Sequence, residues 1–114
     1  MLRIPPKPEY MITVRLAASS LAERSGFDME QIEDIKTAVA EACLLLLNRG
    51  CEDALEILFH TEGAFQVEIS STMCSQQNHT MEEELSMFLL TALVDDVKIS
   101  DQNTKQSLTL IKRF

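Results

Sequence analysis

The side chains best suited to metal binding or nucleophilic chemistry are few in this sequence and poorly spaced for either. The three cysteines are Cys43, Cys51 and Cys74, and no two of them form a Cys-x-x-Cys pair. The sequence therefore predicts neither a zinc site nor a disulfide framework. The two histidines, His60 and His79, have no Cys or His partner at ligand spacing. The chain also has only 3 glycines, which argues against a glycine-rich loop that cradles phosphate.

The composition describes an acidic globular protein of ordinary size. Its 114 residues suffice for one domain with its own core, which we expect to span residues 1–114. The net charge of −8 argues against nucleic acid and anionic membranes as partners, because both select clustered Lys and Arg. No apolar run approaches the length of a membrane span, and residues 1–8 lack the apolar core of a signal peptide. We therefore expect a cytoplasmic protein that does not bind membranes.

Two helices are predicted in the first half of the chain. In residues 9–25 the apolar residues recur close to the helical period, and Gly26 suits the end of that helix. Asp28 can cap a second helix, with Gln31 as its capping-box partner, and this helix should end near residues 48–50. Its buried stripe is expected at Ile32, Ile35, Val39, Ala42, Cys43 and Leu46.

A third helix is predicted to begin at Thr80, with Glu83 at the capping-box position. The acidic run at residues 82–84 is interpreted first as a solvated helix start, and alternatively as an acidic patch that docks a basic partner. The core face of this helix is expected at Leu85, Phe88, Leu89, Ala92 and Leu93.

Alternating apolar residues and turn signals predict five strands. They are expected at residues 1–4, 55–60, 65–70, 94–100 and 106–112, and the last four form two hairpins. The chain order is then a strand, two helices, a strand pair, a helix and a second strand pair. This order predicts an α+β protein, a two-layer sandwich in which three main helices cover one face of a mixed, mostly antiparallel five-stranded sheet.

Several segments of the sequence resemble a known family. They are Pro8-Glu9-Tyr10, Val14-Arg15-Leu16, Arg24-Ser25-Gly26-Phe27 and the run from Ile32 to Cys43. These segments resemble anti-sigma-factor serine kinases, which are GHKL-type kinases of Gram-positive partner switches. Residues 89–99 are similar to the family's final helix and following strand, so the resemblance covers nearly the whole chain. It implies the Bergerat fold, also called the histidine-kinase-like ATPase fold.

The resemblance also implies where the catalytic residues of such a kinase would lie. Glu41 matches the Glu that serves as general base. The metal-binding Asn, one helical turn later, is replaced by Leu45, which offers no oxygen to Mg²⁺. Arg49 stands where the family often has a His. We interpret Glu41 as a degenerate remnant, with a surviving catalytic role as the alternative.

The two other nucleotide-binding boxes and the lid also depart from the family. The Asp-x-Gly-x-Gly box aligns with residues 71–75, where Ser71 replaces the Asp that reads adenine and Met73 replaces the first Gly. The glycine-rich turn aligns with residues 82–86, where three carboxylates stand in the place of a triphosphate. Residues 71–80 are too few for the family's flexible lid. These departures predict a chain with no nucleotide or metal cofactor and with the ATP lid deleted.

The run of four leucines from Leu44 to Leu47 admits two interpretations. One is a core stripe with one ordinary exposed Leu. In the other, Leu45 together with Met73 and Met87 fills the vacated nucleotide pocket, because an empty cavity is costly. The vestigial pocket then consists of Leu45, Arg49, Ser71, Met73 and Met87.

The lost boxes predict a regulator that binds proteins rather than phosphorylating them. The resemblance implies a sigma factor, an anti-anti-sigma protein or a related kinase as partner, and a homodimer that involves the N-terminal strand. Arg15 is a candidate partner contact, because the family uses its N-terminal part in protein–protein contacts. Two alternatives stay open: an active serine/threonine kinase with a rewired ATP site, and a sensor of another small ligand.

Overall fold

The computed structural model describes residues 1–50, 53–72, 81–102 and 104–114, with the backbone alone at 81 and 82. Strand β1 (Leu2–Ile4) and a short 3-10 helix, η1 (Pro8–Tyr10), precede helices α1 (Met11–Arg24) and α2 (Met29–Asn48). The second half contains β2 (Leu55–His60), β3 (Phe65–Thr72), α3 (Met81–Leu93), β4 (Asp96–Gln102) and β5 (Lys105–Lys112). Within the described ranges, no helix combines the length and the apolar character that crossing a membrane requires.

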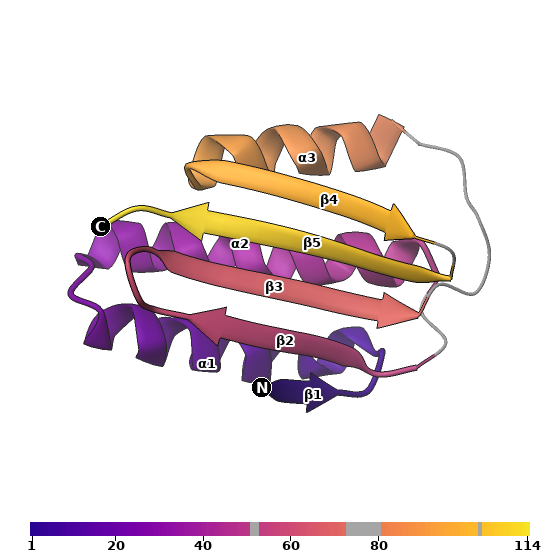
Figure 1. Cartoon of the computed structure of the whole chain (residues 1–114), viewed down its shortest axis with the longest axis horizontal. Coiled ribbons are helices and arrows are strands. Elements are labelled where there is room, and N and C mark those ends of the chain that lie inside the picture. Colours follow the sequence, from indigo (N-terminus) through magenta and orange to yellow (C-terminus); the bar gives the residue numbers. More distant parts are fainter. Residues whose placement is uncertain (51–52, 73–80, 103) are drawn as a thin grey trace.

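The five strands form one sheet in the order β1-β2-β3-β5-β4. Each pair of neighbouring strands is antiparallel, so the sheet that was expected to be mixed is antiparallel throughout its described pairs. The three helices form a second layer, with α2 behind the central strands, α1 toward β1 and β2, and α3 along β4 (Figure 1). This arrangement confirms the predicted α+β sandwich and leaves β1 and β4 as the edge strands.

Helix α2 is the centre of the helical layer, and its start is encoded locally. The Asp28 Oδ1 atom accepts a hydrogen bond from the backbone N–H of Gln31 at 2.8 Å. In return, Gln31 Oε1 accepts one from the backbone N–H of Asp28 at 3.1 Å. These two bonds satisfy N–H groups at the helix start that have no intrahelical partner, which confirms the predicted capping box.

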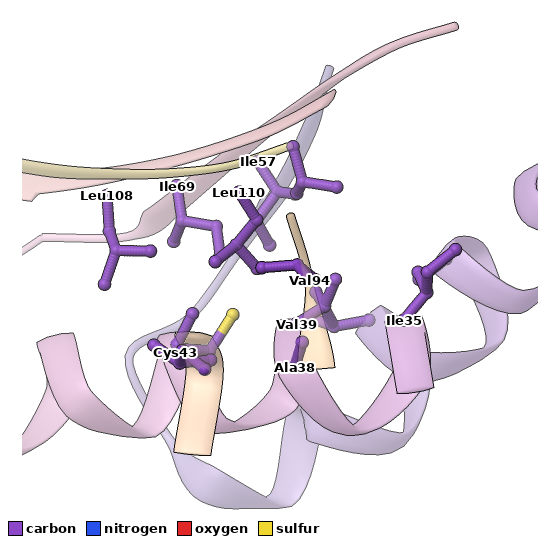
Figure 2. Close-up of a cluster of buried hydrophobic side chains, with 14 of the residues drawn as sticks. Ile35, Ala38, Val39, Cys43, Ile57, Ile69, Val94, Leu108 and Leu110 are labelled. Atoms are coloured by element: carbon purple, nitrogen blue, oxygen red, sulfur yellow. The ribbon is translucent and has the colours of Figure 1, made fainter. Parts of the chain in front are cut away.

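The hydrophobic core lies between α2 and the sheet. Five of the six residues predicted for the buried stripe of α2 are buried, and Ile32 is half-buried and packs against them. Figure 2 shows side chains of α2 below the sheet strands, facing side chains that descend from β2, β3 and β5. The labelled members are Ile35, Ala38, Val39 and Cys43 on α2, Ile57, Ile69, Leu108 and Leu110 on the strands, and Val94.

Helix α3 buries a different face from the one predicted. Thr80, its predicted N-cap, lies outside the described residues. Of the predicted core face only Leu93 is half-buried, whereas Leu90 is fully buried and Met87 packs against the core. The apolar residues of α3 surround the helix axis, so their periodicity does not select one face. Packing against α2 and β4 at the sheet edge selects the Leu90 face. The prediction was therefore wrong for Leu85, Phe88, Leu89 and Ala92, which are exposed.

Candidate functional site

The side of α2 that carries Glu41, Leu45 and Arg49 is engaged with α3. These residues are spaced four apart, so they follow one another along one side of the helix. Glu41 is half-buried, and its Oε1 accepts a hydrogen bond from the Ser86 hydroxyl at 2.8 Å. The carboxylate at the position of the general base is therefore tied to α3.

Leu45 lies one turn further along and belongs to the hydrophobic core. Its neighbour Leu46 is also buried, while Leu44 and Leu47 are half-buried. The interpretation that one leucine of this run is exposed was therefore wrong. The reason is that α2 is packed against α1, α3, β3 and β5, which leave little of its surface in water.

Met87 packs against the same core. Met73 lies outside the described residues, so the filling of a pocket by all three side chains stays a prediction.

Arg49 joins three elements at the C-terminal end of α2. Its guanidinium approaches Glu83 Oε1 in the first turn of α3 through Nε at 2.9 Å and Nη2 at 2.6 Å. Its Nη1 contacts Asp101 Oδ1 near the end of β4 at 2.8 Å. The side chains of Arg49 and Glu83 are 7% and 9% exposed, whereas that of Asp101 is 44% exposed. Because a charge is stable away from water only when it is paired, this cluster holds α3 against α2.

The burial of Glu83 corrects an interpretation made from the sequence. The acidic run at residues 82–84 was interpreted as a solvated helix start, and this holds for Glu84, which is exposed, but not for Glu83. The contact responsible comes from Arg49, 34 residues earlier in the chain. A sequence window around the helix start cannot contain that partner.

A second polar group lies at the same end of the sheet. Gln106 on β5 pairs with Asp101 on one side and with Ser71 on the other. The fully buried Gln106 donates from Nε2 to Ser71 Oγ at 2.9 Å and to the carbonyl oxygen of Leu46 at 3.3 Å. Its Oε1 atom has no hydrogen-bond partner within the described part of the chain. Ser71 lies within β3, which extends beyond the strand predicted at residues 65–70, and it serves as a buried hydrogen-bond acceptor.

Cys43 provides no reactive thiol on this helix. Burial raises the pKa of the Cys43 thiol to about 12, so the group stays protonated at neutral pH and packs as an apolar side chain. Over the residues that the structure describes, no three His, Cys, Asp or Glu side chains are arranged to hold a metal ion.

The structure brings most of the candidate residues to one region, between α2, α3 and the end of the sheet. Arg15 is exposed on α1 and takes part in none of these contacts. Sequence reasoning missed Ser86, Asp101 and Gln106. The alternation in β5 could have indicated Gln106, because it falls on the same face as Leu108 and Leu110. Ser86 falls in residues 82–86, the segment aligned with the glycine-rich turn, which indicated the region but not the hydrogen bond to Glu41.

Comparison with known proteins agrees with this architecture. Residues 4–112 match the family model of the histidine kinase-like ATPase domain. The chain is 34% identical to the serine-protein kinase RsbW of Oceanobacillus iheyensis, in an alignment that covers 89% of this chain and 78% of the relative. It is 33% identical to the serine-protein kinase RsbW of Listeria innocua, with coverage of 86% and 76%.

A solved structure shares the fold. The crystal structure of the RsbU and RsbW domains of Rv1364c from Mycobacterium tuberculosis superposes with a TM-score of 0.73 at 19% identity. The superposition covers 98% of this chain and 32% of the solved one. The fold thus defines a histidine kinase-like ATPase domain. On the strength of the sequence matches, the chain belongs to that family and, within it, to the group of the RsbW serine-protein kinases.

Proposed function

We propose that this chain is a pseudokinase of the RsbW group that regulates transcription by binding proteins in a partner switch, without phosphorylating them. The observation that carries the proposal is a pair of contacts between α2 and α3. They lie at the positions where the family binds its nucleotide. Glu41 is hydrogen-bonded to Ser86, and Arg49 is paired with Glu83. Both pairs are contacts within the chain, and both would compete with a ligand for the same atoms.

The side chains on this face do not fit Mg²⁺ with a triphosphate. Mg²⁺ requires oxygen ligands in octahedral geometry, and Leu45 supplies none at the position of the Asn. Phosphate requires cations or free N–H groups. Arg49 is a cation on this face, but it already contacts two carboxylates, Asp101 and, at the start of α3, Glu83. These side chains support the proposal that the chain no longer binds a nucleotide. Glu41 is then a remnant of the family's general base.

The length of the chain supports the loss of the lid. The alignment with the Oceanobacillus relative spans 123 positions, although this chain has only 114 residues, so the relative carries segments that this chain lacks. We propose that one of them is the ATP lid and that residues 1–114 form a single lidless domain. Residues 73–80, which would contain the lid, lie outside the described residues.

The partners follow from the family. We propose that the chain binds a sigma factor, an anti-anti-sigma protein or a related kinase in the cytoplasm, with exposed Arg15 as one contact. We also propose a homodimer that uses the edge strand β1, because an open sheet edge is stabilised when a second copy covers it. Sedimentation of the full chain tests the dimer, and a monomer at all concentrations contradicts it.

Nucleotide binding is tested by thermal denaturation with and without ATP and Mg²⁺, using the Oceanobacillus relative as a parallel sample. A ligand at 100 times its Kd stabilises a protein by about 2.7 kcal/mol, which is readily seen as a rise in Tm. We expect such a rise for the relative and none for this chain. A magnesium-dependent rise for this chain would favour the rival function, an active kinase with a rewired site.

Partner binding is tested separately with the sigma factors and anti-anti-sigma proteins encoded in the same genome. We expect one of them to bind this chain in the absence of ATP and without gaining phosphate. Arg15→Glu should weaken that complex, with Arg24→Glu as a control at another exposed arginine of α1. Phosphate transfer from ATP to any of these proteins contradicts the proposal.

A further inference from the structure

The outer side of α3 carries an apolar stripe that faces solvent. Leu85 is 63% exposed, Phe88 75% and Leu89 39%, and Ala92 is exposed as well. These residues occupy positions i, i+3, i+4 and i+7, so they lie on one side of the helix. We call Leu85, Phe88, Leu89 and Ala92 the α3 stripe.

The edge strand beside α3 adds another exposed apolar side chain. Ile99 on β4 stands opposite Leu108 in the sheet, and residues directly opposite each other project to the same face. Since Leu108 is in the core, Ile99 projects to the side of the sheet that carries the helices. It is nevertheless 37% exposed, because β4 is the edge of the sheet. Helix α3 lies along this strand in Figure 1.

The α3 stripe is not explained by the packing of the fold. Single exposed apolar side chains are common on protein surfaces, but a stripe at helical spacing is characteristic of an interaction surface. The opposite side of α3 already supplies the core contact through Leu90. Exposure of the stripe therefore contributes nothing to the stability of the chain, and it favours association with another molecule.

The charges around the stripe indicate what kind of molecule fits it. Helix α3 contains no Lys or Arg. Exposed carboxylates lie at both ends of the stripe, Glu84 before it and Asp95 after it, and Asp95 also accepts a hydrogen bond from the backbone N–H of Arg113. A cation lies at the same end of α3, because Lys112 Nζ donates to the carbonyl oxygen of Leu93 at 3.0 Å, but Lys112 stands opposite the buried Phe65 and so projects to the core side of the sheet. On β4, Asp101 is already paired with Arg49. The cation of this strand, Lys98, alternates with Val97 and Ile99 and so projects to the other face of the sheet.

A second copy of the chain fits this surface poorly. In a two-fold contact residue i of one copy meets residue j of the other, so two stripes packed antiparallel would bring Glu84 of each copy toward Asp95 of the other. Each copy also carries a net charge of −8. Opposite charges favour an interface and like charges oppose it.

We propose that the α3 stripe docks an amphipathic helical segment of another protein, whose apolar side chains cover Leu85, Phe88 and Leu89 and whose flanking Lys and Arg side chains face Glu84 and Asp95. The surface is separate from the contact between α2 and α3. The inference therefore stands whether or not the chain has lost its nucleotide.

The probes are two designed helical peptides of about 20 residues that share the same leucine stripe. One has Lys at the flanking positions and the other has Glu. We expect the basic peptide to bind the full chain in fluorescence anisotropy, with affinity that falls as salt is raised from 50 to 500 mM (about 14 to 4 Å in Debye length). We expect the acidic peptide to bind at least tenfold more weakly.

The variant Phe88→Ala identifies the surface, and Leu16→Ala on α1 is its matched control. Leu16 is 65% exposed and flanked by Arg15, so both variants remove a large exposed apolar side chain and should keep the Tm of the parent. Truncating a central aromatic side chain of an interface to Ala commonly weakens binding more than tenfold. We expect Phe88→Ala to weaken the basic peptide at least tenfold and Leu16→Ala to leave it unchanged. Glu84→Lys should weaken it severalfold and flatten the salt dependence.

Four results would overturn the inference. They are absence of binding by the basic peptide, equal binding by the acidic one, equal loss in Phe88→Ala and Leu16→Ala, and a dimer that Phe88→Ala converts to a monomer. The last result would assign the stripe to a second copy. A dimer through β1 would survive Phe88→Ala, and nucleotide binding plays no part in these measurements. If the stripe fails to bind the basic peptide, the proposed function therefore still stands.

Discussion

Replacing Arg49 by Met should lower the free energy of unfolding by about 3 kcal/mol, although Met fills much of the same volume. The guanidinium contacts Glu83 through two nitrogens, and both side chains are more than nine-tenths buried. Removing one partner of a buried ion pair typically costs about 3–5 kcal/mol, because the remaining charge stays away from water. We take the lower end of this range for two reasons. Asp101, the other carboxylate that contacts Arg49, is 44% exposed and can be hydrated when the guanidinium is gone. Glu83 also keeps a contact besides the one with Arg49.

The double variant should behave in the opposite way. Adding Glu83→Gln to Arg49→Met removes the buried negative charge and keeps the shape of the side chain. Replacing both members of a buried pair is often nearly neutral, so the double variant should recover at least half of the lost stability. The single variant Glu83→Gln should be less stable than the parent, since it removes the negative charge that Nε and Nη2 of Arg49 contact.

Urea unfolding followed by circular dichroism measures these differences. For a chain of this size about 3 kcal/mol corresponds to a fall in Tm of roughly 10–15 °C. Lys36→Met is the matched control, because it removes the Lys36–Glu33 pair, whose side chains are 24% and 58% exposed. That loss should stay within about 0.5 kcal/mol. If Arg49→Met costs no more than Lys36→Met, or if Glu83→Gln deepens the loss in the double variant, the account of this cluster is refuted.

Three further predictions concern the helices around the site. Leu45→Asn should destabilise the chain by about 3 kcal/mol, since it places an amide in the core, and an unchanged Tm contradicts this. Asp28→Ala should cost about 1 kcal/mol by removing the capping box, with Glu62→Ala, an exposed carboxylate outside any helix, as the comparison in urea titrations. The raised pKa of Cys43, about 12, means that its protonated form stabilises the fold below the pKa of the unfolded thiol, near 9.0. This contribution is lost as pH rises from about 9 toward 12, so the parent should lose about 2–3 kcal/mol more than Cys43→Ala between pH 8 and pH 11.

The fold was predictable because its signals are local. The capping box of α2 joins residues three apart, and the alternation of β2, β3 and β5 repeats every two residues. The buried stripe of α2 was predictable for the same reason, since its apolar residues recur at helical spacing from Ile32 to Leu46. Where the pattern was ambiguous, as in the strongly apolar α3, the predicted face was wrong.

The candidate site was predictable only in part. The spacing of Glu41, Leu45 and Arg49, four residues apart, is enough by itself to put them on one side of a helix. Their partners come from elsewhere in the chain: Ser86 is 45 residues after Glu41, and Asp101 is 52 residues after Arg49. A window of neighbouring residues contains no trace of such pairs.

The amino-acid sequence by itself determined the helices and strands, the acidic surface and the missing oxygen ligand at Leu45, because propensity, charge and donor chemistry belong to single residues and their near neighbours. The tertiary structure alone decided which side of α3 enters the core, how Glu83 becomes buried and why Phe88 faces water. The physical reason is that burial is a property of two surfaces in contact. The second surface, here α2 and the β4 edge, exists only after the chain has folded.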